Sequence, residues 1–264
     1  MRILVCVKRV PAPGARINVT DDGQGVETAH LGFTTSPHEE CAVEEAVLLI
    51  EANGGSVTVL TLGPAEAVEQ LRYAASVGAQ ELVLLPTEPT PSGCSTWDPQ
   101  RTAAALSEAI GEIEAEDGTF DLILFGNESA DSGGFQVGVR VAHALGRPIV
   151  NGIKDIDITD DKIIARRAVD AGFEVYELPR PAVLGVKEGL NLPRYPTMKG
   201  RLASKKVELV EKTVAADAGG QAMIRLHRPA EEVSNTEILA DASTSVEEAA
   251  VKVVDLLEEI GVLQ

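Results

Sequence analysis

The sequence is short of basic residues and of long apolar runs, and each shortage excludes a class of protein. It holds 23 Lys and Arg against 41 Asp and Glu, which gives a formal net charge of −18. Nucleic acid is therefore not an expected partner, because phosphate binding needs clustered cations. No apolar run reaches about 18 residues, so no membrane span is predicted, and the first residues read as a strand without the cleavage pattern of a signal peptide.

Cysteine and histidine are also scarce and scattered. Cys6, Cys41 and Cys94 form no CxxC pair and have no metal-ligand spacing, which indicates a reducing, cytoplasmic compartment. The four histidines lie apart along the chain, so no metal site is predicted. The sequence has no nucleophile elbow and no His/Asp pair at a useful spacing, so we predict no catalytic residue and no enzyme activity of its own.

Strand and helix signals alternate over the first 150 residues. Ser36 is expected to cap a helix, with Pro37 at its first position and Glu39 completing a capping box. Single helices between strands imply parallel pairing with right-handed crossovers. We therefore predict a doubly wound, mostly parallel α/β sheet of the Rossmann-like or adenine nucleotide α-hydrolase-like kind. Its strands are expected over 3–7, 56–62, 81–85 and 122–125, and its helices over 37–53, 64–78, 99–116 and 135–145.

The pattern changes after residue 150. Three β-like runs, 156–167, 173–178 and 182–186, predict a meander added to the sheet. Residues 189–206 carry almost no helix or strand signal, and one more strand is expected over 207–210. A polar tether over 212–235 then leads to a capping box, Thr244 to Glu247, and a helix over 246–260. We predict a nucleotide-binding domain over 1–210 and, over 211–264, an extended arm that packs on a partner.

The most informative stretch is 121–148, where an apolar strand leads into a loop of glycines and small polar residues and then a helix. Such a loop lets backbone N–H groups and the positive end of the helix bind a phosphate. It is neither a Walker loop nor a GxGxxG fingerprint, and a βα turn without a ligand is the alternative. An ATP-using transferase is disfavoured, because the loop lacks the lysine and metal ligands of phosphoryl transfer.

The topology predicts where a ligand would bind. In doubly wound sheets the crevice lies beyond the carboxyl ends of the strands, where the strand order reverses. Three strand ends are candidates: Cys6 to Lys8, Leu62 to Pro64 and 126–131, with the helix start at Ser36–Glu39 beside them. An adenine fits between apolar strand ends with its phosphate at 133–138. Asp131 either accepts from a ribose hydroxyl or caps the following turn.

Five segments match a known family in the right order: residues 5–11, 36–46, 63–65 with 76–79, 126–138, and 191–199 with 205–206. The Ala-Val-Glu-Glu-Ala element at Ala42–Ala46 and the Pro-Arg-Tyr element at Pro193–Tyr195 are quite specific. On these residues the chain resembles the β (small) subunit of electron transfer flavoproteins along nearly its whole length.

The resemblance implies a heterodimer. In this family the α subunit holds a redox-active FAD, and the β subunit packs against it and usually holds a buried, structural AMP. Electron-bifurcating relatives hold a second FAD in that place. Carried onto this chain, the resemblance implies nucleotide contacts from one strand end each at Cys6 and Leu62, from the helix start, and from the glycine loop. These residues are Cys6, Ser36, Pro37, His38, Glu39, Leu62, Asn127, Glu128, Ser129, Ala130, Asp131, Ser132, Gly133, Gly134, Phe135, Gln136, Val137 and Gly138.

The resemblance also implies a recognition loop over 189–206 that docks on flavin-containing dehydrogenases. Met198 stands where a single apolar side chain enters the partner, and a flexible thioether suits a promiscuous surface. Lys199 and Arg201, with Lys205 and Lys206, are expected to steer acidic partners despite the negative total charge. An incidental methionine on a solvated loop is the alternative.

The chain departs from the family at several positions. Pro13 and His38 stand where relatives often place an aromatic near the FAD ring, so His38 either contacts the partner's flavin or is a solvated residue. The segment Gln136–Gly138 resembles the second-FAD relatives, whereas 132–135 does not, so AMP and FAD both stay open and AMP is favoured. Ala168 stands where relatives carry an acid, and Ala171-Gly172 replaces a Gly-Gly pair.

A stand-alone nucleotide-sensing α/β protein is the rival hypothesis. It would use the same phosphate loop but would need no partner subunit. The C-terminal region discriminates between the two, because the tether and the last helix are suited to reach across another subunit. The favoured hypothesis is therefore a nucleotide-holding subunit that supports the FAD of an α subunit and carries electrons from dehydrogenases to a downstream acceptor.

Overall fold

The computed structural model describes residues 1–88, 97–159, 162–215, 219–230, 236, 238–241 and 243–263. Cys94, residues 160–161 and parts of the expected tether lie outside these residues. The chain divides into two compact units, Met1–His227 and Arg228–Gln264. Residues after position 210 bond back to the rest of the first unit. Gln221 N donates to Asp98 Oδ2 at 2.7 Å, and Leu226 N donates to the Gly23 carbonyl at 2.8 Å.

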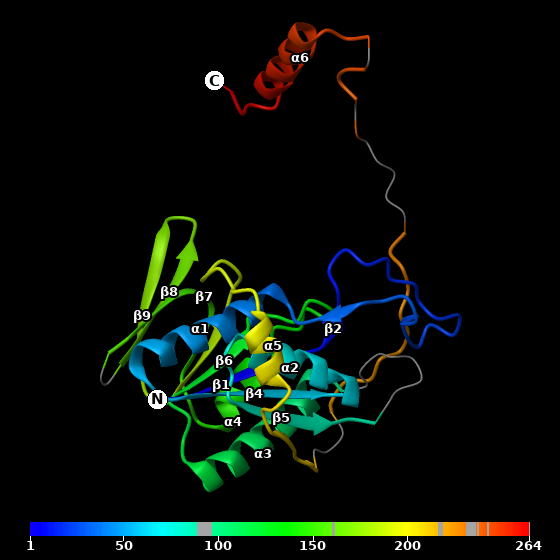
Figure 1. Cartoon of the computed structure of the whole chain (residues 1–264). Helices are drawn as coiled ribbons and strands as arrows, with labels where there is room; N and C mark the ends of the chain where they lie inside the picture. Colours follow the sequence, from blue (N-terminus) through cyan, green and yellow to red (C-terminus); the bar gives the residue numbers. More distant parts are fainter. Residues whose placement is uncertain are drawn as a thin grey trace. The chain divides into compact units, whose positions relative to one another are not determined.

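The first unit is built on one large sheet, whose strand order in the described residues is β11-β5-β4-β1-β6-β10-β7-β8-β9 (Figure 1). Neighbours are parallel from β11 to β7, and only β7-β8 and β8-β9 pair antiparallel. The predicted doubly wound, mostly parallel α/β fold is confirmed. Its strands are β1 (Arg2–Val7), β4 (Ser56–Gly63), β5 (Glu81–Pro86), β6 (Leu122–Gly126), β7 (Ile149–Ile158), β8 (Lys162–Val169), β9 (Gly172–Pro179), β10 (Ala182–Val186) and β11 (Leu209–Glu211), with β2 (Val10–Pro11) and β3 (Phe33–Thr34) paired separately.

Helices cover both faces of the parallel part of the sheet. On one face lie α1 (Pro37–Asn53) and α2 (Val68–Val77), which follows a short 3₁₀ turn η1 (Ala65–Ala67), and on the other lie α3 (Pro99–Asp117) and α4 (Val137–Ala144). The short helix α5 (Met198–Ser204) packs on α2, and α6 (Val246–Glu259) belongs to the second unit. Each strand of the centre sends alternate side chains to opposite faces, so both layers need apolar residues. This explains the unbroken apolar runs of β1 and β6.

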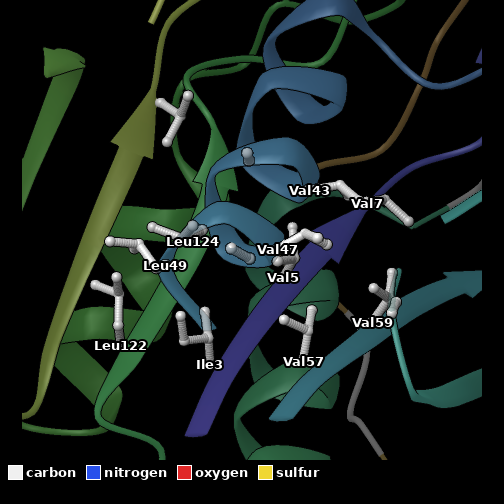
Figure 2. Close-up of a cluster of buried hydrophobic side chains, with 14 of the residues drawn as sticks. Ile3, Val5, Val7, Val43, Val47, Leu49, Val57, Val59, Leu122 and Leu124 are labelled. Atoms are coloured by element: carbon white, nitrogen blue, oxygen red, sulfur yellow. The ribbon is translucent and has the colours of Figure 1, made fainter. Parts of the chain in front are cut away.

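The two apolar layers differ in which helices they contain. Ile3, Val5 and Val7 of β1 pack with Val43 and Val47 of α1 on one face (Figure 2). The intervening Leu4 and Cys6 belong to the layer on the other face, with the buried side chains of α3 and α4. The core thus fixes β1 between α1 and the α3–α4 pair, which sets where its carboxyl end lies.

The sequence predicted that residues 182–186 form part of the meander. This prediction is wrong, because strand β10 lies outside the meander. It lies between β6 and β7 and is parallel to both, and all five of its residues are buried. A short, wholly apolar run is typical of a parallel strand that is covered on both faces, whereas meander strands alternate. The meander is instead β7-β8-β9, and β7 begins at Ile149, earlier than expected.

Two helix expectations also need correction. Residues 198–204 form helix α5, although this stretch has no helical signal in the sequence. Helix α6 is capped by Ser245, whose partner in the capping box is Glu248, one residue after the expected pair. Thr244 Oγ1 accepts instead from Asp241 N, at 3.2 Å, so it does not cap the helix.

Candidate functional site

The strand order reverses between β1 and β6. From β1 the chain moves outward through β4 to β5, and α3 then returns it to β6 on the other side of β1. The carboxyl ends of these two strands, at Val7 and Gly126, therefore open on the crevice that a doubly wound sheet offers to a ligand. The strand end at Leu62 lies on β4, across β1 from this crevice, where it is half-buried against the core.

The start of α1 is tied to the end of β1 through Glu39. Glu39 Oε2 accepts from Ser36 N at 3.0 Å and Ser36 Oγ accepts from Glu39 N at 3.3 Å, which completes the predicted capping box. Glu39 Oε1 accepts from Lys8 N at 3.0 Å. A Cβ at Gly126 would lie only 2.8 Å from Glu39 Cγ, so only glycine lets β6 end this close to the helix.

Glu39 is a buried ionisable residue. Burial raises the pKa of Glu39 to about 8, and the hydrogen bonds from Ser36 and Lys8 and the Lys8 charge offset this only in part. The nearby Asp131 carboxylate adds to the rise. A carboxyl group thus sits at the base of the crevice in a setting that favours its neutral form at physiological pH.

The glycine loop closes over the end of β1 through an ion pair. Lys8 Nζ lies 2.6 and 2.7 Å from the two carboxylate oxygens of Asp131. Burial works against the charge of Asp131, but the Lys8 charge and hydrogen bonds outweigh it and hold the pKa of Asp131 below its usual range. Asp131 Oδ1 also accepts from the next backbone amide, Ser132 N, at 2.8 Å.

Further hydrogen bonds tie the loop to β10 and join residues within the loop itself. Asn127 N donates to the Val186 carbonyl of β10 at 2.8 Å, which holds the start of the loop to the sheet. Within the loop, Gly133 N donates to the Ser129 carbonyl at 3.0 Å and the hydroxyls of Ser129 and Ser132 lie 2.8 Å apart. These hydrogen bonds order the loop around Gly133.

The backbone of the loop is held in an unusual conformation. Gly133 has a φ of +53°, and the non-glycine Phe135 has a φ of +54°. For an L residue this left-handed region costs roughly 1–2 kcal/mol. The Phe135 side chain is 55% exposed, so burial of the ring does not offset the cost. Strain of this kind concentrates at binding sites, which is consistent with a ligand-binding role for the loop.

Helix α4 begins without a side-chain cap. Helices α1, α3, α5 and α6 each begin at a Ser, Asp or Thr whose side chain accepts a first-turn N–H. At α4 the N-cap position is Gln136, whose side chain makes no such bond and accepts from Arg140 Nε at 3.2 Å instead. A phosphate or another anion fits this end, because it would satisfy free N–H groups and the helix dipole.

His38 joins three segments at the crevice. Its Nδ1 accepts from Glu188 N at 2.8 Å, and its Nε2 lies 3.4 Å from Glu128 Oε1 in the glycine loop. The side chain is only 15% exposed, so His38 is not the solvated helix residue that was one of its two expected roles. Together these contacts hold α1, the loop after β6 and the segment after β10 at one point.

The structure thus brings together most of the residues that the sequence singled out. The helix start Ser36–Glu39 and the loop 126–138 face one another at the ends of β1 and β6. Cys6 is buried in the core, and burial raises the pKa of its thiol far above the usual range, with Glu39 adding to the rise. Lys8 was predicted to lie at a strand end, but no role was predicted for its side chain. The acidic residues of the loop, Glu128 and Asp131, were the available signal that a cation lies nearby.

Met198 lies apart from this crevice, as the first residue of α5. Its side chain is 76% exposed, and Lys199 and Arg201 are exposed beside it. Thr197 caps the helix by accepting from Gly200 N at 3.0 Å. A Cβ at Gly200 would lie 2.2 Å from the Ser76 carbonyl oxygen, so α5 crosses α2 in close contact. Met198 is therefore presented by a short helix and not by an irregular loop.

The described residues contain neither a membrane-spanning helix nor a cluster of metal ligands. None of the helices there has both the length and the apolar character needed to cross a bilayer. No group of three or more His, Cys, Asp or Glu side chains gathers there as a metal site.

Comparisons with known proteins show the family of the chain. The family model of the electron transfer flavoprotein domain matches residues 25–217. A Thermoanaerobacterium thermosaccharolyticum protein named electron transfer flavoprotein subunit beta is 34% identical over 200 residues, 76% of this chain and 73% of the relative. Proteins of the same name from Mycobacterium tuberculosis and Bradyrhizobium diazoefficiens are 37% and 31% identical, covering 81% and 100% of this chain and 79% and 98% of their own lengths. The chain therefore belongs to the electron transfer flavoprotein family, among its beta subunits.

Proposed function

We propose that this chain holds a structural AMP in the crevice between β1 and β6, packs against an α subunit and supports the FAD of that subunit. The pair then carries electrons from flavin-containing dehydrogenases to a downstream acceptor in the cytoplasm. The observation that carries the AMP assignment is the uncapped start of α4, with Gly133 and Lys8 beside it at the point where the strand order reverses.

The residues present fit an adenine nucleotide. The first turn of α4 offers N–H donors for the phosphate, and Gly133 leaves open space in front of them, since nothing lies within 4 Å of its Cβ position. The apolar ends of β1 and β6 offer a surface for the adenine. The acidic Asp131 does not oppose this, because its charge is paired with that of Lys8.

The role of this chain in the reaction is positional. FAD, when bound to the α subunit, supplies the redox chemistry. This chain orders its crevice through Glu39, Lys8 and Asp131 and presents Met198 to the partner on α5. Electron transfer rates fall steeply with distance, so docking geometry is the contribution that such a subunit makes.

A second FAD in place of AMP is the alternative, and Gln136–Gly138 is the feature that favours it. To decide, the chain is co-expressed with its α subunit, and the purified complex is denatured and its nucleotides identified by chromatography. One FAD and one AMP for each heterodimer would support the proposal. Two FAD would make this crevice a redox site and support a bifurcating carrier, and a chain that binds nucleotide without a partner would support the stand-alone hypothesis. If no complex forms and no nucleotide is released, both the proposed heterodimer and the proposed nucleotide site would be overturned.

A further inference from the structure

The segment that follows β10 lies along helix α1. Near the first turn of α1, Glu188 N donates to His38 Nδ1 at 2.8 Å. Further along, Asn191 Nδ2 donates to the Cys41 carbonyl at 3.0 Å and to Glu45 Oε2 at 2.9 Å. We term the segment 188–194 the strap and residues 195–206, which include Met198, the recognition segment. The strap therefore links the crevice at one end to the recognition segment at the other.

The strap ends in a clamp of one arginine between two carboxylates of α1. Arg194 Nε lies 3.0 Å from Glu44 Oε1, and its two terminal nitrogens lie 2.7 and 2.9 Å from the oxygens of Glu51. The backbone Arg194 N also donates to Glu44 Oε2, at 3.1 Å. Glu44 is buried whereas Glu51 is half exposed, and the fixed fork of a guanidinium suits both at once.

Apolar burial is uneven along the strap. Leu190 and Pro193 are half-buried, whereas Leu192 and Tyr195, on either side of the clamp, are each 91% exposed. The polar contacts of Asn191 and Arg194 add to this partial burial in holding the segment against α1. Without the guanidinium, the carboxylate of Glu44 would lose the cation that compensates its burial.

Met198 lies between this clamp and a second fixed point. The second point is the contact of α5 with α2, where Gly200 meets Ser76 and Arg72 Nη1 donates to the Ser204 carbonyl at 2.6 Å. Only three residues separate Arg194 from Met198. The position of the Met198 side chain is thus set by α1 on one side and α2 on the other.

We infer that Arg194 is a positioning residue for partner docking: clamped by Glu44 and Glu51, it holds the recognition segment in its docking shape before a partner arrives. This inference rests on the proposed role of Met198. Ordering a mobile segment during association costs affinity, so a segment that is ordered beforehand binds more tightly. The clamp also gives α1 a second task beyond forming one side of the crevice.

The first test measures the segment directly in the heterodimer. Hydrogen–deuterium exchange of peptides covering 189–206 is compared in the parent, Arg194→Ala, Arg194→Lys and Glu51→Gln. We expect exchange over 195–206 to be about tenfold faster in Arg194→Ala, with smaller rises in the other two, because they keep part of the clamp. Lys212→Gln is the matched control, since Lys212 also lies between two glutamates of one helix, Glu112 and Glu116 of α3.

The second test uses the flavin-containing dehydrogenase that reduces the parent complex fastest. Arg194→Ala should raise the KM for that dehydrogenase about tenfold with kcat nearly unchanged, because the ordering cost is then met on docking. Reduction by dithionite and the nucleotide content should not change, which separates the effect from misfolding. Arg194→Lys should restore part of the KM.

The outcomes separate this inference from the proposed function. Unchanged exchange and unchanged KM in Arg194→Ala would overturn the clamp, even if Met198→Ala slows electron transfer. Faster exchange with no effect of Met198→Ala on the rate would show an ordered segment whose proposed docking role has failed. If the Arg194→Ala complex does not assemble and the hydrogen exchange of Glu51→Gln equals that of the parent, the positioning role of Arg194 would also be overturned.

Discussion

Replacement of Gly133 by alanine tests the phosphate assignment most directly. Gly133 has a φ of +53°, and no atom lies within 4 Å of the position of an added Cβ. Gly146, just after α4, has a φ of +65° and equally open surroundings. Alanine at either position therefore meets the same backbone strain and no clash, but only the methyl group at Gly133 enters the crevice.

The expected magnitudes differ between folding and binding. The left-handed conformation costs alanine roughly 1 kcal/mol, so both variants should lose about the same stability. At Gly133 the methyl group would also keep the phosphate from its closest approach. Loss of one hydrogen bond to a charged group is worth about 1.5–3 kcal/mol, which corresponds to a roughly tenfold to hundredfold weaker Kd for AMP.

The assay is calorimetric titration of AMP into heterodimer from which the nucleotide has been removed, with urea unfolding of the same samples. Gly133→Ala should weaken AMP binding and Gly146→Ala should not, at similar losses of stability. Equal AMP affinity in the two variants would refute a phosphate site at Gly133. Equal weakening in both would assign the effect to strain near α4.

Three further predictions concern the rest of the chain. The pKa of native Glu39 is raised from 4.5 to about 8, so the native state binds more protons between these values, and stability should fall as the pH rises through them. Urea titrations should show a shallower fall in Glu39→Gln, and an unchanged slope would contradict the burial argument. Met198→Ala should lower electron transfer from dehydrogenases with the complex intact, and stopped-flow rates equal to the parent's would refute the recognition role. Deletion of residues 236–264 should weaken heterodimer assembly in sedimentation experiments, and an intact heterodimer would speak against a docking arm.

The parts of the fold that the sequence predicts well are those with local chemical causes. Ser36 and Asp98 cap α1 and α3 because their side chains accept N–H groups three residues on, a spacing that is visible in the sequence. The four central strands are visible as apolar runs between turn residues. The crevice followed from these elements, because parallel strands and single crossovers leave few topologies.

The parts that were missed depend on residues far apart in the sequence. Helix α5 is seven residues long, and what holds it is the contact of Gly200 with Ser76 on α2. No local pattern reveals such a contact. The position of β10 likewise depends on its pairing with β6 and β7, which lie far from it in the sequence. At α6 the capping box is formed by Ser245 and Glu248 and not by the expected Thr244 and Glu247, because Thr244 Oγ1 already accepts from Asp241 N.

The second unit indicates why this chain is expected to need another subunit. Helix α6 has 14 residues, none of them buried, and a helix of that length is marginal by itself in water. Its residues Val246, Ala249, Val253 and Leu256 recur at alternating spacings of three and four, the pattern of a helix seam that docks against another surface. An apolar stripe of this kind stays in water only at a cost. The free energy that keeps α6 folded is therefore expected to come from the α subunit, which makes the stability of the arm and the assembly of the heterodimer one equilibrium.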